Sequence, residues 1–294
     1  MTAATRTIEG PDGRTLGIHD AGDPAGTLIV FHHGTPSGGL LHAPWVEHAA
    51  HTGVRLVGYD RPGYGGSTPQ PGRTVADAAA DAVAIADALG AGSFATFGTS
   101  GGGPHALACA ARAPDRVTAV AVLGSVAPFE AGGLNYFAGM GRDNWIEFGA
   151  ALHGRATLEP FLAEQSRALA GAAPEDLAEE MRTLVGEHDQ RALDAGLAVW
   201  MHATAAGGLA PGPQGWVDDD LAFVEPWGFE LAGITVPALV WHGHHDRFVP
   251  VAHGEWLART IPGAEARIDP DEAHLSLLAH RIPAVLDWLR ERLG

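Results

Sequence analysis

Lysine is absent from this chain, and cysteine occurs only once. The basic residues number 18, all of them arginine, against 35 acidic residues, so the formal net charge is −17. Such an acidic chain is a poor match for nucleic acid or for an anionic membrane surface. The single cysteine, Cys109, excludes a disulfide framework within the chain and lies on the apolar face of an expected helix, where it is a small core residue.

Long apolar segments are also missing. Residues 1–14 contain no apolar core of the kind found in signal peptides, and no run reaches the roughly 20 apolar residues of a membrane-spanning helix. We therefore expect a cytoplasmic protein that acts on a small molecule and has neither a nucleic-acid nor a membrane partner. The sequence does not determine the oligomeric state.

The most informative motif present is Gly98-Thr99-Ser100-Gly101-Gly102, a G-x-S-x-G sequence. It follows the apolar run 93–97 and precedes the helix-like segment 104–112. Between a strand and a helix, this motif is typical of a sharp turn that projects the serine hydroxyl from the top of a sheet. A glycine-rich loop that binds phosphate is disfavoured, because no Gly-Lys-Ser/Thr follows and the proline at position 104 has no N–H.

A serine nucleophile needs a base and an acid that orients the base. Asp246 lies in the loop just past the expected strand 238–242, and His274 is expected in the loop after the last strand. The chain order Ser100, Asp246, His274 is that of the α/β-hydrolases and differs from the order in chymotrypsin-like or subtilisin-like enzymes. His280, deeper in the expected last helix, is the fallback base.

The developing oxyanion needs two N–H donors. Gly101, the residue after the serine, supplies one of them. The buried strand expected at 27–32 is followed by His33-Gly34-Thr35-Pro36, and Thr35 is the candidate for the second donor. Pro36 has no N–H and stiffens this loop.

With these motifs, the chain resembles the serine hydrolases of the α/β-hydrolase fold, including their proline iminopeptidase-like branch. The resemblance is carried by residues 33–36, 60–67, 98–102, 243–250 and 273–275. It implies a mostly parallel central sheet flanked by helices, with a helical cap inserted, and a mechanism without cofactor or metal. In the segment 60–67, which we interpret as scaffold, Asp60 and Arg61 are expected to form a structural ion pair.

Apolar patterns elsewhere predict strands that alternate with helices, as in a parallel sheet with right-handed crossovers. An N-terminal hairpin opens the chain. The expected segments are strands 5–8, 15–19 and 27–32, helix 41–51, strand 54–59, helix 74–89, strand 93–97, helix 104–112, strands 117–123 and 238–242, helix 251–260 and strand 264–268. The catalytic loops would then gather at the carboxyl ends of the strands.

This alternation lapses near residue 128 and resumes near residue 234. We therefore expect a core of residues 1–127 and 230–294, with residues 128–229 inserted as a helical cap over the active site. Three apolar stripes predict cap helices, namely Leu158, Phe161, Leu162 and Leu169; Leu177, Met181, Leu184 and Val185 after Pro174; and Leu193, Leu197, Trp200, Met201 and Thr204. Candidates for lining the substrate pocket are Trp145, Trp200, Trp216 and Trp227, although packing within a small cap is the more common role.

The acidic run Asp218-Asp219-Asp220, with Glu225 nearby, has two interpretations. In the cap, these carboxylates could hold a cationic substrate, such as the N-terminal amine of a peptide. Aspartate is also common in loops and at helix N-termini, and a run of charges is usually a solvated face. We favour the second interpretation.

A metal site is a further alternative. His242, His244 and Asp246 reproduce the start of the H-x-H-x-D-H pattern of metallo-β-lactamase-like hydrolases, and imidazoles at alternate strand positions could bind zinc. However, Arg247 takes the place of the next histidine, and the motif lies too near the C-terminal end for that fold. The metal interpretation is therefore disfavoured.

The sequence thus predicts a serine hydrolase of carboxylic esters, with a lactone or a thioester as variant substrates. Ser100 attacks, His274 takes its proton, Asp246 orients the imidazole, and Thr35 and Gly101 bind the oxyanion. A proline iminopeptidase-like aminopeptidase is the alternative enzyme, and a non-catalytic ligand receptor on the same fold is the alternative outside enzymes.

Overall fold

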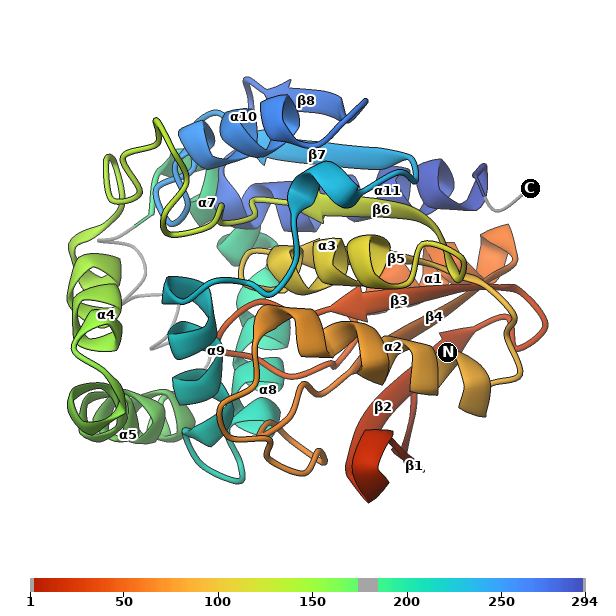
Figure 1. Ribbon diagram of the computed structural model, residues 1–294, viewed down its shortest axis with the longest axis horizontal. Coiled ribbons are helices and arrows are strands. Elements are labelled where there is room, and N and C mark those ends of the chain that lie inside the picture. The colour runs from red at the N-terminus through yellow and green to blue at the C-terminus, as the bar shows by residue number, and fades with distance from the viewer. Residues whose placement is uncertain (1–2, 174–184, 293–294) are drawn as a thin grey trace.

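Strands of five to eight residues form a single sheet. The computed structural model describes residues 3–173 and 185–292, and its eight strands have the order β1-β2-β4-β3-β5-β6-β7-β8 (Figure 1). Their bounds are β1 (Ala4–Glu9), β2 (Thr15–Gly22), β3 (Thr27–His32), β4 (Val54–Tyr59), β5 (Phe94–Thr99), β6 (Val117–Leu123), β7 (Ala238–Gly243) and β8 (Glu265–Asp269). The pairs β1–β2 and β2–β4 are antiparallel, and all other neighbours are parallel. The expected hairpin and mostly parallel sheet are confirmed.

Alternate residues of the central strands face opposite sides of the sheet, and helices cover both sides. On one side Val30 and Val120 pack with α2 (Ala78–Ala88), α3 (Gly102–Arg112) and α10 (Val251–Thr260). On the other side Phe31 and Ala121 pack with α1 (Ala43–Thr52) and α11 (His274–Arg290). Burial on both sides explains why these strands are continuous apolar runs in the sequence.

Residues 128–229, between β6 and β7, form what we call the insertion. Its described helices are α4 (Arg142–Leu152), α5 (Arg155–Gly171), α7 (Glu187–Ala192), a π-helical segment (Leu193–Leu197), α8 (Ala198–Gly208) and α9 (Gln214–Val224). Figure 1 shows α4, α5 and α9 grouped beyond one end of the sheet. The helix expected after Pro174 lies outside the described residues, apart from the buried Val185. Helices α4 and α9 were not predicted; in α9 the run Asp218-Asp219-Asp220 interrupts the apolar positions Val217, Leu221 and Val224.

Two helix starts differ from expectation because side chains cap them. The helix expected at 74–89 opens with a 3-10 turn, in which Asp77 Oδ2 accepts hydrogen bonds from the N–H and the hydroxyl of Thr74 at 2.7 and 2.9 Å. Helix α11 begins at His274, because Ser276 Oγ accepts the Ala273 N–H at 2.8 Å. His274 is therefore the first residue of a helix and does not lie in a loop. Across the described ranges, no helix has the length and apolar character needed to cross a bilayer.

Candidate active site

Ser100 lies at the sharp turn between β5 and α3. Its φ is 53°, a left-handed conformation that is uncommon for a residue with a side chain and that costs on the order of 1–3 kcal/mol. The turn is tight enough to require glycine on either side. A Cβ on Gly98 would overlap the carbonyl of Gly102, and a Cβ on Gly102 would overlap the carbonyl of His32. The G-x-S-x-G spacing thus follows from the close passage of β3, β5 and α3 around one serine.

Asp246 and His274 form a buried pair. Asp246 follows β7, and its Oδ2 lies 2.7 Å from His274 Nδ1, while its Oδ1 accepts the N–H groups of Phe248 and Val249 at 2.9 and 2.8 Å. His242, within β7, places Nε2 3.4 Å from the same Oδ2. The carboxylate is therefore fixed from several directions, and the Nδ1 contact leaves His274 Nε2 for another partner.

Charge and burial oppose each other in this pair. Burial acts to raise the pKa of Asp246, but His274 and His242 outweigh it and lower that pKa to about 2. Burial acts to lower the pKa of His274, but Asp246, with a further contribution from Asp189, raises it above the usual value for histidine. The pair therefore favours an ionised aspartate beside an imidazole that binds a proton readily.

Ser100 and His274 approach Gly124 from two sides. The Ser100 N–H donates to the carbonyl of Leu123 at 2.9 Å, and a Cβ on Gly124 would lie 3.0 Å from His274 Nδ1. Gly124 also has a φ of 55°. Both this left-handed conformation and the nearness of His274 favour glycine at the position. Over residues 3–173 and 185–292, Ser100 Oγ makes no hydrogen bond to His274. Such contacts are often long in unliganded hydrolases and shorten when a substrate binds.

Thr35 and Gly101 lie side by side next to Ser100. A Cβ on Gly101 would lie 2.5 Å from Thr35 Oγ1, and a Cβ on Gly34 would lie 3.4 Å from Ser100 Cβ. In the part of the chain that the structure describes, the backbone N–H groups of Thr35 and Gly101 donate no hydrogen bond. Two unengaged donors beside a serine are the arrangement that an oxyanion requires.

Asp219, on α9, is the centre of a buried polar network that the sequence did not reveal. Its carboxylate is fully buried and accepts hydrogen bonds from the guanidinium groups of Arg61 and Arg73, from the Tyr64 hydroxyl and from the Thr35 hydroxyl. Burial acts to raise the pKa of Asp219, but the two arginines outweigh it and hold that pKa well below its usual range. The only sequence signal was the acidic run itself.

The expected ion pair between Asp60 and Arg61 is wrong. Asp60 lies 3.2 Å from His19 Nε2 and accepts the N–H groups of Gly39 and Gly66, whereas Arg61 binds Asp219. Neighbouring residues at the end of an extended strand point to opposite sides, so these two side chains diverge.

The interpretation of the acidic run as a solvated face is also wrong. Asp218, Asp219 and Asp220 are all buried, at no more than 2% exposure. Asp218 pairs with Arg155. Asp220 shares a hydrogen bond with Glu147 of α4; burial and the Glu147 carboxyl raise the pKa of Asp220 well above its usual range. The raised pKa favours a protonated Asp220 that donates to Glu147, and this contact joins α4 to α9.

Asp189, on α7, caps the helix that begins with His274. Its Oδ1 accepts the N–H groups of Leu275 and Ser276 at 2.8 and 2.9 Å. A carboxylate at this position satisfies two free donors of α11 and interacts favourably with the helix dipole. The insertion thus contacts the serine side of the site through Asp219 and the histidine side through Asp189. No sequence pattern pointed to Asp189, because its partners lie 86 and 87 positions away.

The four tryptophans do not gather around Ser100. Trp145 is 52% exposed and lines a surface hollow of about 550 Å³, while Trp200 packs on Trp45. Trp216 donates its indole N–H to Glu147, and Trp227 packs against Phe229. Phe223 and Phe248, which the sequence analysis did not single out, do lie next to the candidate site. Phe223 would contact a Cβ on Gly101 at 3.0 Å, and the Phe248 ring lies 5.1 Å from that of His274.

The other histidines discussed above take separate positions. His242 is buried, with Nε2 2.7 Å from the Val249 carbonyl, whereas His244 is exposed against His245. His280 contacts Glu272 and is half exposed. Among the described residues, no group of three or more histidine, cysteine or carboxylate side chains is arranged to hold a metal ion.

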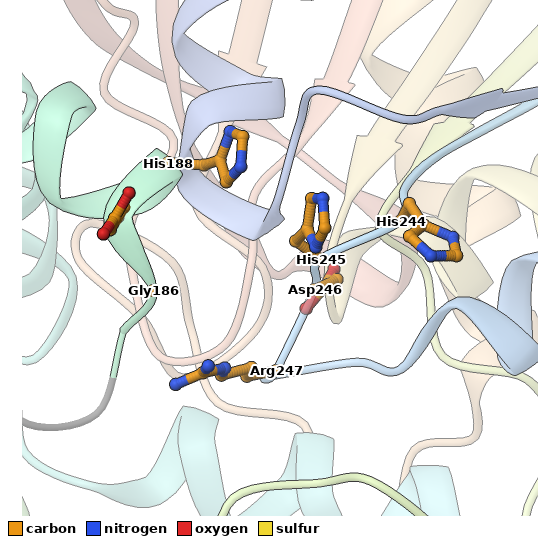
Figure 2. A pocket seen from close by; sticks show the side chains of 7 residues that line it. Gly186, His188, His244, His245, Asp246 and Arg247 are labelled. Atoms are coloured by element: carbon orange, nitrogen blue, oxygen red, sulfur yellow. The ribbon is translucent and has the colours of Figure 1, made fainter.

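A pocket of about 460 Å³ adjoins the loop that carries Asp246. Figure 2 shows His188 from α7 facing His245, with Arg247 extending below them toward Gly186. The rings of His188 and His245 stack at 4.7 Å, and Glu187 and His244 also line this pocket. The pocket is formed where the insertion meets the β7–α10 loop.

Comparisons with known proteins agree with this architecture. The family model described as the alpha/beta hydrolase fold matches residues 27–280. A pimeloyl-[acyl-carrier protein] methyl ester esterase of Chromobacterium violaceum is 30% identical over 86% of this chain and 89% of its own length. A 2-hydroxymuconate semialdehyde hydrolase of Pseudomonas putida is 27% identical over 91% of this chain and 87% of its own length. The structure of the enol-lactonase from Burkholderia xenovorans superposes with a TM-score of 0.71 at 21% identity, over 97% of this chain and 99% of that one. It shows a likeness of fold.

The shared proton of Glu147 and Asp220 predicts a pH-dependent stability. Because their pKa values are raised in the folded state, the folded chain binds more protons than the unfolded chain, and stability is lost as the pH rises through the folded pKa values. Glu147→Gln/Asp220→Asn should gain on the order of 1 kcal/mol relative to wild type as the pH rises above the ordinary carboxyl range, measured by chemical denaturation. If the free energy of unfolding changed with pH in the same way in the variant and in wild type, the proton shared by Glu147 and Asp220 would be contradicted.

The contacts of Asp189 predict two effects of its removal. Asp189→Ala should lower the free energy of unfolding by about 1 kcal/mol, because the first turn of α11 loses its acceptor. It should also lower the pKa of His274, measured by NMR titration, because the Asp189 charge raises that pKa. Glu187→Ala, at an exposed position on the same helix, is the matched control and should change neither quantity. An unchanged His274 titration in Asp189→Ala would show that the two residues are uncoupled.

Proposed function

The chain belongs to the α/β-hydrolase fold family, and from that premise we propose that it is a serine hydrolase that cleaves carboxylic esters through an acyl-enzyme on Ser100. The observation that carries the proposal is the buried contact of 2.7 Å between Asp246 and His274, beside a serine flanked by two unengaged N–H groups. This arrangement combines a base, its orienting acid and an anion site around one hydroxyl.

The chemistry follows from these positions. Ser100 Oγ attacks the ester carbonyl while His274 Nε2 takes its proton, and Asp246 holds the imidazole through Nδ1–H and stabilises the imidazolium. The carbonyl oxygen becomes an anion that the Thr35 and Gly101 N–H groups bind. His274 then gives the proton to the departing alkoxide, which leaves as the alcohol. Water, deprotonated by His274, attacks the acyl-enzyme, and His274 returns the proton to Ser100 Oγ as the acid leaves.

The insertion acts as a cap in this proposal. Phe223 on α9 adjoins Gly101 and Phe248 contacts the His274 ring, so both can border the substrate. A substrate with an apolar acyl or alcohol group fits such a border. The relatives named as a methyl ester esterase and an enol-lactonase support an ester, and they keep a lactone within the substrate class.

The environment of the cap carboxylates favours an ester over a peptide. An aminopeptidase needs a carboxylate free to pair with the substrate amine. Asp218 and Asp219 are bound by arginines, and Asp220 shares a hydrogen bond with Glu147. A screen of p-nitrophenyl esters of rising chain length beside prolyl- and alanyl-arylamides tests this choice. We expect turnover of the esters, and turnover dominated by the arylamides would establish the aminopeptidase instead.

Removal of the nucleophile should abolish turnover. Ser100→Ala should fold and lose activity by on the order of 10,000-fold or more, because only this hydroxyl carries the acyl group. A fluorophosphonate probe should label the wild type at Ser100, as mapped by peptide mass spectrometry, and leave the variant unlabelled. Labelling of the variant at the wild-type level would place the nucleophile elsewhere.

The pH profile should follow His274. Since a protonated base cannot accept the Ser100 proton, kcat/KM should fall as the pH drops through the raised pKa of His274. In Asp246→Asn the residual activity should show its midpoint at lower pH, because the charge that raises this pKa is gone. His280→Ala, a histidine variant on the same helix, should keep the wild-type midpoint. A midpoint that moves with His280 and not with Asp246 would assign the base to His280.

A further inference from the structure

The carboxylate of Asp219 connects the insertion to the loop that carries Thr35. Asp219 Oδ2 accepts the Thr35 hydroxyl at 2.7 Å and the Tyr64 hydroxyl at 2.9 Å. Thr35 and Asp219 are 184 positions apart, so this contact exists only when α9 lies against the β3 loop. Thr35, whose backbone N–H is one oxyanion donor of the proposed mechanism, is therefore bound through its side chain to a residue of the insertion.

Arg61 extends the same connection to the rest of the loop. Its guanidinium donates to Asp219 Oδ2 at 2.6 Å and to Thr35 Oγ1 at 3.0 Å. It also donates to the carbonyls of His33 and Gly34. Arg61 is fully buried and is paired with Asp219. The backbone of this loop is thus held by a guanidinium whose own position depends on the Asp219 carboxylate.

A second path leads from Asp219 to Gly101. Asp219 Oδ1 accepts Arg73 at 2.6 Å, and Arg73 lies 3.5 Å from His105 Nε2. His105 in turn donates its Nδ1–H to the Gly101 carbonyl at 2.9 Å. Burial and the charge of Arg61 lower the pKa of His105 well below its usual value, so the ring is neutral and its single hydrogen serves Gly101. Both donors of the anion site therefore connect to one carboxylate.

We propose that Asp219 is a positioning residue that fixes the Thr35 and Gly101 donors in the geometry that binds the oxyanion. The proposal rests on the ester hydrolysis proposed above. A buried ion pair contributes little net stability compared with apolar packing, but donors that cannot move bind developing charge far better than mobile ones. The anion site is then assembled from two parts of the chain, the β3 loop with the elbow and helix α9.

A rate comparison between esters and thionoesters tests this role. Sulfur is larger than oxygen and a weaker hydrogen-bond acceptor, so a thionoester gains little from the anion site. Asp219→Asn should lower kcat for esters on the order of 100-fold with a smaller change in KM, because a donor displacement of about 1 Å costs that much. The same variant should affect thionoesters much less, so the ester-to-thionoester ratio of kcat should fall by at least about 10-fold.

Two further variants keep the test decisive. Asp218 lies one position away on α9, is also buried and pairs with Arg155. Asp218→Asn should therefore leave the ester-to-thionoester ratio unchanged. Thr35→Val removes the hydroxyl that donates to Asp219 and accepts from Arg61, and it leaves both ion pairs of Asp219 in place. It should lower the ratio in the same direction even if Asp219→Asn fails to fold. In the double variant Thr35→Val/Asp219→Asn, the ester-to-thionoester ratio should fall little further than in Asp219→Asn, because both substitutions break the contact between Thr35 and Asp219.

The outcomes separate this inference from the proposed function. Wild-type ester hydrolysis that Ser100→Ala abolishes establishes the hydrolase, and its absence would overturn the function and the role of Asp219 together. If that activity is present, a lowered ratio in Asp219→Asn or Thr35→Val supports the positioning role. An unchanged ratio in the folded variants would overturn the role of Asp219 alone, as would a rise in KM with kcat preserved.

Discussion

A charge buried in a protein interior must be paired, and here that requirement determines how the insertion meets the core. Asp219 has no exposed surface, and its carboxylate is bound by Arg61 from the loop after β4 and by Arg73 from the segment before α2. Removing one partner would leave another charge unpaired at a cost of about 3–5 kcal/mol. Helix α9, the β3 loop and the β4 loop are therefore held in one relative position.

The same requirement for partners applies to Asp218, Asp219 and Asp220, and each of these adjacent residues meets it in a different environment. Asp219 is ionised because two cations surround it, and Asp218 pairs with Arg155. Asp220 faces another carboxyl and retains a raised pKa. Like charges in one sequence run thus fix the insertion in separate ways, through a buried ion cluster, an ion pair and a shared proton. Asp246 shows the same control of ionisation within the candidate site, where two histidines lower its pKa.

The sequence predicted the parts whose cause is local or periodic. The strands β4 and β6 have the expected bounds because runs buried on both sides are recognisable, and the elbow follows from glycine spacing around a strained serine. Helix α9 was not predicted, because three aspartates beside Gly215 are typical of a loop. The pairing of Asp60 with Arg61 was wrong because adjacency in sequence does not give adjacency of side chains. The role of Asp219 depends on partners 146 to 184 positions away, and no local pattern encodes them.

In the proposed mechanism an acyl group passes through Ser100, beside an anion site that the insertion completes. Rapid quenching during turnover of p-nitrophenyl acetate, followed by intact-protein and peptide mass spectrometry, detects that intermediate. We predict a burst of p-nitrophenol equal to the enzyme concentration and one acetyl group on the peptide that contains Ser100. Turnover without any acylated Ser100, or with the acetyl group on another residue, would contradict an acyl-enzyme on Ser100.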